Sequence, residues 1–220
     1  MRLVRYRDTA YVKGTYEPFV CQAILENVCR GTIAVDVGAR LGYMTLLLAK
    51  CVGENGTVIA FEPLPENFCV LKQNVTMNRL QNVRVEGKAV SNRSGTVALN
   101  IFDWTPFPGT SQIGSKSARA QAIVFMTHQV PAISLDHYLG NGLHIQFVKI
   151  DVEGFEDLVI EGMRETLKRD RPTLVLEHLP KRALELLREA GYGIWDLQSG
   201  TEFPLGTEPR ERCLARPRML

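Results

Sequence analysis

The sequence predicts an α/β fold with a doubly wound, mostly parallel sheet. Apolar runs of strand length alternate with segments of helical period along the 220 residues, and turns that contain glycine or acidic residues follow several of these runs. Such alternation places helices on both faces of a parallel sheet, which binds ligands beyond the carboxyl ends of its strands. The length favours a single domain over residues 1–220, in which residues 1–30 form an N-terminal helical cap segment.

Each expected element follows from a local pattern. Buried apolar runs predict strands at residues 32–37, 57–61, 82–85, 145–150 and 173–177, with an extra strand at 97–102. Apolar residues at helical spacing predict helices over residues 43–51, 65–78, 155–168 and 181–190. Short strands, expected to be antiparallel, complete the sheet at residues 192–196, around Phe203 and at 213–215.

Residues 103–134 interrupt this alternation. They contain three prolines and two glycines and show no sustained hydrophobic period. Irregular segments of this length in compact domains are often functional lids. Because the segment precedes the fourth main strand, we expect it to be a substrate lid over the ligand edge of the sheet, rather than a mobile excursion without a role.

The turn after the first strand, AVDVGARLGYMT, carries Asp36, Gly38 and Gly42 in the spacing D-x-G-x-x-x-G. Dinucleotide sites use G-x-G-x-x-G instead, because the second glycine admits a pyrophosphate. The observed spacing fits S-adenosylmethionine (AdoMet). The Asp36 carboxylate suits its ammonium group, directly or through water, Gly38 gives close backbone access, and Gly42 lets the helix pack on the strand. Glu62 ends the second strand and can accept hydrogen bonds from both ribose hydroxyls, a feature that dinucleotide sites share.

Several longer stretches carry a resemblance to a known family. They include VDVGARLGYMTLLLA, VIAFEPLPENFCVLKQNV, KIDVEGFE and LVLEH, and the match runs in order from about Gly14 to the end of the chain. In these stretches the chain resembles the FkbM-type methyltransferases, which are class I AdoMet-dependent enzymes. The resemblance implies a Rossmann-like, seven-stranded sheet and O-methylation of a hydroxyl on a small molecule, namely a sugar, a glycolipid or a polyketide-type natural product.

The resemblance also implies the cofactor-binding residues. The methionine part of AdoMet is expected to contact Asp36, Gly38, Ala39 and Gly42, and the ribose is expected to bind Glu62. The adenine is expected beside Ala89 and Val90, at the end of the third strand. Further contacts with the cofactor are expected at Ser91 and Glu17. Ser91 faces the adenine or caps a turn. The family usually has asparagine where this chain has Arg40, and this cation either reaches outward or crowds the methionine end.

Acidic side chains follow the fourth and fifth strands, where methyl transfer is expected. Asp151 and Glu153 follow one strand, and Glu177 and His178 end the next. Neighbouring strand ends of a parallel sheet meet at one edge, so these groups are expected to converge. Either Asp151 or His178 acts as a general base, with Glu153 beside them, or Asp151, Glu153 and Glu177 hold a divalent cation such as magnesium. The metal-free arrangement is favoured.

Composition and motif spacing argue against several other classes of function. A net charge of +2 and no strongly basic face argue against nucleic-acid binding. The glycine spacing disfavours an NAD(P)-dependent oxidoreductase, and the acidic strand ends disfavour a non-catalytic AdoMet-fold subunit. Five cysteines without a C-x-x-C pair suggest reduced, mostly buried thiols, and no apolar run spans a membrane, so a cytoplasmic enzyme is expected.

Overall fold

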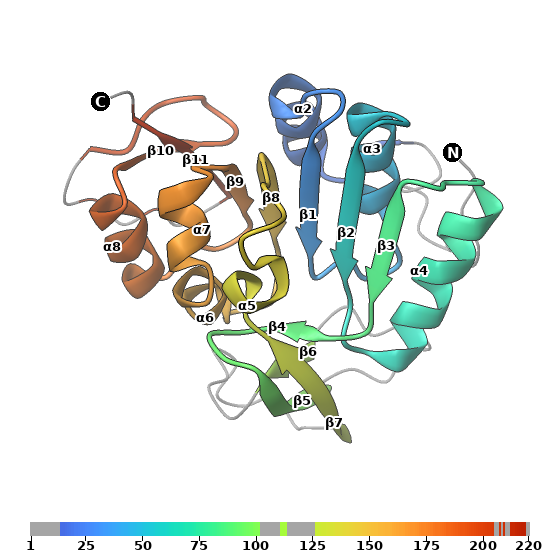
Figure 1. The fold of residues 1–220 in the computed structure, drawn as a ribbon. Coiled ribbons are helices and arrows are strands. Elements are labelled where there is room, and N and C mark those ends of the chain that lie inside the picture. Colours follow the sequence, from blue (N-terminus) through green and yellow to red (C-terminus); the bar gives the residue numbers. More distant parts are fainter. Residues whose placement is uncertain are drawn as a thin grey trace.

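The computed structural model describes residues 14–101, 111–113, 126–204, 207, 209 and 212–218. Its main sheet has seven strands in the spatial order β10-β11-β9-β8-β1-β2-β3 (Figure 1). β11 runs antiparallel to both of its neighbours, and the other neighbouring pairs are parallel. This order confirms the doubly wound, mostly parallel sheet. The strands are β1 (Ile33–Val37), β2 (Thr57–Phe61), β3 (Val83–Glu86), β8 (Phe147–Ile150), β9 (Thr173–Leu176), β10 (Tyr192–Asp196) and β11 (Cys213–Pro217).

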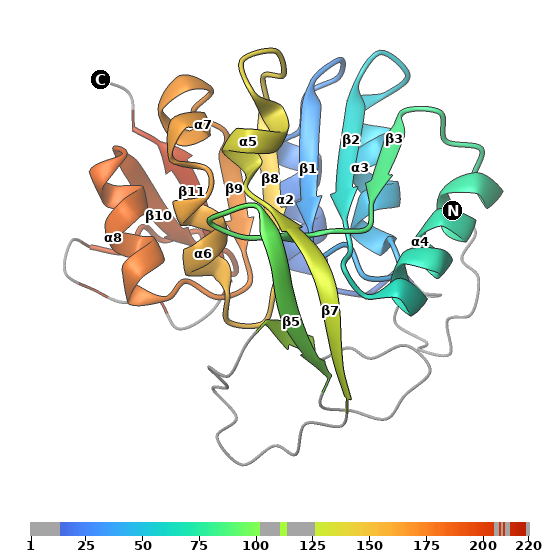
Figure 2. The same cartoon turned by 60° about the horizontal axis from the view of Figure 1, so that its bottom comes forward.

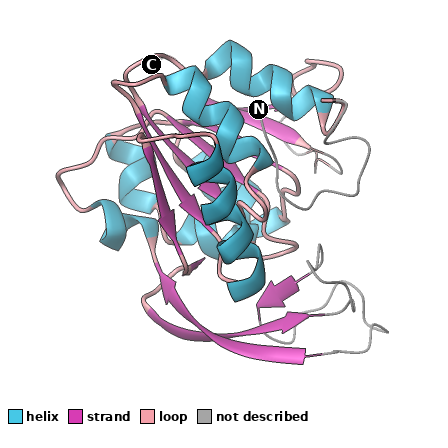
Figure 3. Ribbon diagram, turned by 90° about the vertical axis from the view of Figure 1, so that its right-hand side faces the viewer, coloured by secondary structure: helices cyan, strands magenta, loops and turns pink. Residues whose placement is uncertain are grey.

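Helices cover both faces of this sheet (Figure 3). On one face lie α2 (Pro18–Asn27), α3 (Tyr43–Val52) and α4 (Pro65–Met77). On the other lie α5 (Leu135–Leu139), α6 (Glu156–Glu161), α7 (Arg164–Arg169) and α8 (Lys181–Glu189). The central strands are therefore buried on both sides and are mostly apolar, with Asp36 and Lys149 as exceptions, which made them recognisable in the sequence.

Alternation along β1 decides which side chains meet which helices. Ala34 packs in the core beneath α2 and α3, whereas Val35 and Val37 pack in the core on the opposite face. Asp36 shares the face of Ala34 and pairs in register with Lys149 of β8. Two charged side chains thus lie together beneath a helix, inside the core.

A second sheet lies beyond the carboxyl ends of β1, β2 and β3 (Figures 1 and 2). It has the order β4-β7-β5-β6, with β4 (Ala89–Val90), β5 (Gly95–Ile101), β6 (Ser111–Ile113) and β7 (Met126–Ile133). β5 confirms the extra strand expected at 97–102. The expectation of an irregular segment over 103–134 is wrong for β6 and β7. Residues 102–110 and 114–125 lie outside the described residues, so the lid role stays a prediction.

Three other expectations need correction. The helix expected over 155–168 is divided into α6 and α7 at Gly162, where a Cβ atom would lie 2.1 Å from the Ser91 carbonyl oxygen, so this position accommodates no side chain. Ala89 and Val90 do not end the third strand, because they leave the main sheet and pair with β7. Around Phe203 there is no strand among the described residues, only an isolated bridge between Trp195 and Glu202.

The described part of the cap segment is helix α2, and residues 1–13 lie outside the description. None of the described helices combines the length and the apolar character that a membrane crossing requires. No disulfide joins the five cysteines, all of which fall in described segments. The expectation that most of them are buried is wrong, because Cys29 and Cys69 are exposed and only Cys213 is fully buried.

Candidate functional site

The turn after β1 approaches the turn after β8 closely. Gly38 has φ of 78°, and a Cβ atom there would lie 1.9 Å from the carbonyl oxygen of Asp151. Any side chain at this position would therefore separate the two turns as well as strain the backbone. Gly38 brings the glycine turn and Asp151 to the same point.

Gly42 begins helix α3 with φ of 95°. A Cβ atom there would meet Cδ1 of Leu71, on helix α4, at 2.5 Å. The interpretation that this glycine serves the packing of a helix on a strand is wrong, because its contact is with a second helix. The absence of a side chain at Gly42 thus leaves room for Leu71 at the start of α3.

Glu62 directly follows β2 and is almost fully buried. Its Oε2 accepts a hydrogen bond from the backbone N–H of Arg40 at 2.8 Å, and its Oε1 accepts one from Leu64 at 3.0 Å. Burial raises the pKa of this carboxyl to about 7, although these hydrogen bonds favour the charged form. The Asn67 side chain also hydrogen-bonds this carboxyl, so three donors hold Glu62 in place and the carboxylate keeps acceptor capacity for a ribose hydroxyl.

A cavity opens at this edge of the sheet, and residues from the turns after β1, β2, β8 and β9 line it. Of the residues proposed from the sequence, those that line it are Gly38, Glu62, Ala89, Val90, Asp151, Glu153 and Glu177. Those outside this lining are Glu17, Asp36, Ala39, Gly42, Ser91 and His178. Sequence reasoning did not propose Tyr16, Asn67, Lys88 and Leu99 as site residues, and these also line the cavity. Asn67 had a usable signal, since it lies in the first helical turn after the Glu62 turn, whereas Leu99 comes from the second sheet.

Arg40 lines the cavity and takes a left-handed backbone with φ of 50°. Asparagine adopts this conformation more readily than other non-glycine residues, which accounts physically for an asparagine at this place in related sequences. Its backbone N–H donates to Glu62, and a backbone group makes this bond whatever the side chain. Arginine therefore changes the cavity wall without removing the link between the two turns.

Lys149 links three groups beneath the cavity. Its Nζ lies 3.0 Å from Oδ2 of Asp151, 3.3 Å from the carbonyl oxygen of Gly38 and 3.6 Å from Oδ1 of Asp36. Asp36 is 0% exposed, its Oδ2 accepts a hydrogen bond from Thr45, and its Oδ1 has no hydrogen-bond partner among the described groups. Lys149 thus holds the ends of β1 and β8 together through charged contacts.

This arrangement separates the charge states of the two aspartates. Burial raises the pKa of Asp36, and the attraction of Lys149 offsets only part of that effect. For Asp151 burial is the largest single effect and opposes its charge, but Lys149, the hydrogen bond with Glu177 and the charge of Arg212 together outweigh burial, so its pKa is lowered. Burial opposes the charge of Lys149, but Asp151 and Asp36 outweigh it and raise its pKa. Direct contact between Asp36 and a cofactor stays a prediction, and the geometry gives Asp36 a contact with Lys149 instead.

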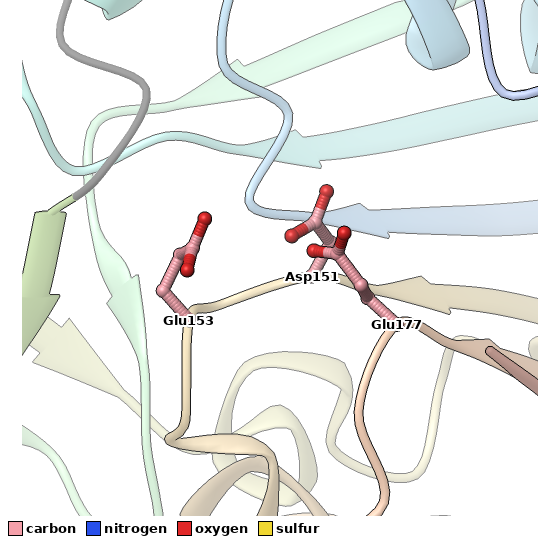
Figure 4. Close-up of side chains that lie close together, drawn as sticks. All are labelled: Asp151, Glu153 and Glu177. Atoms are coloured by element: carbon pink, nitrogen blue, oxygen red, sulfur yellow. The ribbon is translucent and has the colours of Figure 1, made fainter. Parts of the chain in front are cut away.

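Asp151, Glu153 and Glu177 converge on the cavity (Figure 4), and one carboxylate oxygen from each lies within 4.8 Å of the others. A hydrogen bond with Asp151 and burial raise the pKa of Glu177, so Glu177 takes up a proton more readily than Asp151 does. Glu153 reaches the cluster from a left-handed backbone with φ of 51°. The expected convergence of the three carboxylates is therefore present.

The three oxygens form a donor set that suits a hard divalent cation such as magnesium. However, positive charges already contact two of them. Nζ of Lys149 lies 3.0 Å from Asp151, and Nη2 of Arg212 lies 2.9 Å from Oε1 of Glu177. Arg212 also contacts Oε1 of Glu17 at 2.8 Å. Glu17 is therefore linked to Glu177 through Arg212, although it does not line the cavity itself.

His178 does not join this cluster. Its Nδ1 lies 2.9 Å from the backbone oxygen of Glu177, and its exposed ring lines a neighbouring hollow. Glu177 lines both the cavity and this hollow, whereas His178 lines only the hollow. The expectation that the imidazole converges with the three carboxylates is wrong.

The comparisons with known proteins agree with this geometry. A family model described as the methyltransferase FkbM domain matches residues 36–194. The 31-O-demethyl-FK506 methyltransferase FkbM of Streptomyces tacrolimicus is 30% identical over 111 residues, which cover 46% of this chain and 42% of that protein. Methyltransferase sdnD of Sordaria araneosa is 26% identical over 168 residues, or 64% of each chain. The chain therefore spans less than two thirds of the length of these curated relatives.

Solved structures give the same fold. Methyltransferase FkbM from Methylobacillus flagellatus KT has a TM-score of 0.52 at 16% identity, covering 96% of this chain and 56% of that one. A SAM-dependent O-methyltransferase from Thermotoga maritima has a TM-score of 0.50 at 15% identity, covering 100% of this chain and 68% of that one. The sheet is thus that of the class I methyltransferases. With a family model matched over most of its length, the chain belongs to the FkbM family of methyltransferase domains.

Proposed function

We propose that this protein transfers a methyl group from AdoMet to a hydroxyl oxygen of a small molecule, such as a sugar, a glycolipid or a polyketide-type natural product. The observation that carries the proposal is the cavity in which Gly38, Glu62 and Asp151 meet at the carboxyl edge of the sheet. Family membership supports methyl transfer, and the relatives that act on a named compound supply the hydroxyl as acceptor group.

Glu62 is the residue we assign to the ribose. Its two oxygens are held by backbone N–H groups from the Arg40 and Leu64 positions, so they are oriented before a ligand arrives. The cavity that contains Glu62 is also lined by Gly38, which allows a ligand to approach its backbone closely, and by the apolar residues Ala89 and Val90. Ala39, Gly42 and Ser91 serve this pocket indirectly, by shaping the turns that carry its walls.

Asp151 is the residue we assign to the acceptor hydroxyl. In the transfer step a new bond forms between the hydroxyl oxygen and the methyl carbon while the methyl–sulfur bond breaks, and the hydroxyl proton must leave the oxygen. Lys149 keeps Asp151 ionised, so this carboxylate accepts the hydroxyl hydrogen and directs the oxygen lone pair at the methyl carbon. Glu153 stands beside it, whereas His178 is a weaker candidate because it lies outside the cavity.

A bound divalent cation would lower the pKa of the acceptor hydroxyl, and Asp151, Glu153 and Glu177 are the residues that would hold it. We favour the metal-free arrangement. Lys149 and Arg212 already contact two of the three carboxylates, and a divalent cation would have to compete with these contacts. A methyl-transfer assay with and without EDTA separates the arrangements, because only a metal site loses activity.

Calorimetry tests the cofactor assignment. AdoMet should bind one site per chain, and Glu62→Gln should weaken binding by about 1.5–3 kcal/mol, because a charge-assisted acceptor is lost. Glu66→Gln is the matched control, since this exposed glutamate lies one helical turn away and outside the cavity lining. Equal binding by the wild type and Glu62→Gln would place the ribose elsewhere.

Transfer itself is followed with AdoMet labelled on the methyl group and a panel of hydroxylated acceptors. Asp151→Asn keeps the shape of the side chain but loses its charge, so turnover should fall by ~10²–10⁴-fold while AdoMet binding persists. Wild-type turnover in Asp151→Asn would exclude the assigned role. Binding of AdoMet without transfer to any acceptor in the panel would favour a non-catalytic binding subunit.

A further inference from the structure

A second hollow lies next to the cavity at the same edge of the sheet. Its described lining comes from three places: Phe19 of helix α2, the residues after β9 and β10, and Arg212 before β11. The cavity and this hollow share one residue, Glu177. A molecule in the hollow would therefore contact the side chain that is hydrogen-bonded to Asp151.

Arg212 forms the wall between the two spaces. It contacts Glu177 on one side and Glu17 on the other, so its guanidinium is occupied by two carboxylates. Asp196 adds a further carboxylate to the hollow, held by a hydrogen bond from the backbone N–H of Ser199 at 2.6 Å. Among the described lining residues, Asp196 and Glu177 outnumber the single guanidinium of Arg212, so the lining carries no net positive charge to attract an anionic ligand.

The remaining surface combines one aromatic ring with hydrogen-bonding groups. Phe19 is 40% exposed, although it is a large apolar residue on a helix that otherwise packs on the sheet. Around it stand His178, Asp196 and Gln198, which offer an imidazole, a carboxylate and an amide. An aromatic face next to several polar groups suits a ring with one apolar face and hydroxyl groups at its rim.

We propose that this second hollow binds the methyl acceptor, and that the acceptor is an uncharged ring compound that carries hydroxyl groups. The inference rests on the proposed function and locates its second substrate. The ring lies on Phe19, its hydroxyls contact His178, Asp196 and Gln198, and one hydroxyl reaches past Glu177 to Asp151. Phosphorylated or carboxylated acceptors are excluded, because the lining repels them.

This placement also fits the geometry of the reaction. The attacking oxygen must approach the methyl carbon from the side opposite the sulfur, so the acceptor and the cofactor enter from different directions. Glu62 and Asp151 lie at the ends of β2 and β8, with β1 between them in the sheet, and the hollow lies beyond β9. The carboxylates Asp151 and Glu177 are then between the two ligands.

Saturation-transfer-difference NMR of the full chain tests the proposal, with the demethylated cofactor product S-adenosylhomocysteine present throughout. The neutral probe is methyl β-D-glucopyranoside, and the charged probe is glucose 6-phosphate. We expect saturation transfer to the neutral probe and little or none to the charged one. The signal should fall about fivefold in Phe19→Ala, because the ring contact is lost, and it should also fall in Gln198→Ala.

Leu25→Ala is the matched control, since this residue is 63% exposed on the same helix and does not line the hollow. Three results would overturn the proposal: no transfer to the neutral probe, equal transfer to the charged probe, or an undiminished signal in both Phe19→Ala and Gln198→Ala. Calorimetry with S-adenosylhomocysteine is run on the same samples. If the wild type does not bind S-adenosylhomocysteine, the proposed function is overturned. If it binds normally and any of the three NMR results is found, only the acceptor site is overturned.

Discussion

Replacing Lys149 with methionine should destabilise the protein strongly, because the fully buried carboxylate of Asp36 and the partly buried one of Asp151 lose their positive partner. The ammonium group is 6% exposed, lies 3.0 Å from Asp151 and 3.6 Å from Asp36, and also contacts the carbonyl oxygen of Gly38. Methionine fills a similar volume and leaves the apolar part of the side chain in place. The change therefore tests charge more than packing.

The expected cost follows from the burial of the groups left behind. Asp36 is 0% exposed, and its Oδ1 has no hydrogen-bond partner among the described groups. Removing one partner of a buried ion pair typically costs ~3–5 kcal/mol, because the other charge stays buried without compensation. We expect Lys149→Met to lie in this range, as measured by urea unfolding at pH 7. Lys168→Met is the control: its pair with Glu165 is exposed, and such pairs contribute ~0–1 kcal/mol.

The pH dependence of this cost has a defined sign. In the wild type the pKa of Asp151 is lowered, so its contribution to stability is present above the unfolded pKa and is lost as the pH falls through the folded value. Without Lys149, burial should raise the pKa of Asp151 and raise that of Asp36 further. A carboxyl with a raised pKa destabilises the fold above that pKa, and protonation relieves the effect. The difference between wild type and Lys149→Met should therefore shrink as the pH falls from 7 to 5.

The double variant Lys149→Met with Asp36→Asn should recover part of the loss, because one uncompensated charge is removed. Unfolding curves at pH 5, 6 and 7 for the wild type and the variants give the complete comparison. A cost below 1 kcal/mol at pH 7, or a cost that does not change with pH, would refute the argument that these charges stabilise one another.

Three further predictions concern other parts of the site. Gly38→Ala should cost ~3 kcal/mol or more in chemical unfolding, because its Cβ would lie 1.9 Å from the carbonyl oxygen of Asp151. Gly200→Ala is the control and should cost only ~1–2 kcal/mol, because Gly200 also has a positive φ of 68° but no atom lies within 4 Å of the added Cβ. Equal costs for the two variants would contradict the close approach at Gly38. Ser134→Ala should cost ~1 kcal/mol by the same assay, because its hydroxyl accepts a hydrogen bond from the backbone N–H of His137 in the first turn of helix α5. An unchanged midpoint would show that this cap contributes nothing. AdoMet affinity should rise from pH 6 to pH 8, because Glu62, with its pKa of about 7, becomes an ionised acceptor over this range. Titrations of Glu62→Gln with AdoMet should show no such rise. The same rise in Glu62→Gln would assign the pH dependence to another group.

The sequence predicted the central strands and the convergence of the carboxylates because both depend on short segments. β1, β2 and β8 are mostly apolar runs, interrupted by Asp36 in β1 and Lys149 in β8, and Asp151 and Glu177 directly follow the neighbouring strands β8 and β9. The positions of these side chains then follow from the parallel sheet alone. The same reasoning failed for His178, because its place next to Glu177 in the chain suggested that both reach the cavity, whereas only Glu177 does.

The second sheet could not be predicted from local pattern. β7 contains Pro131, which argues against a strand, and its neighbour β5 begins 36 residues before Pro131 in the chain, at Gly95. Pairing of strands so far apart depends on tertiary contacts more than on the propensity of either segment. Leu99 enters the cavity through that sheet, so its role was equally hidden.

The contact of Arg212 with Glu17 has a consequence for how the protein is made. The two residues are 195 positions apart, and Arg212 also holds Glu177. During synthesis, the segments around β1, β2 and β8 leave the ribosome well before Arg212 does, so the nascent chain can form most of the sheet while this wall is still missing. The site is therefore assembled in two stages, and a nascent chain that has not yet reached β11 should hold the fold of the central strands without a finished binding site.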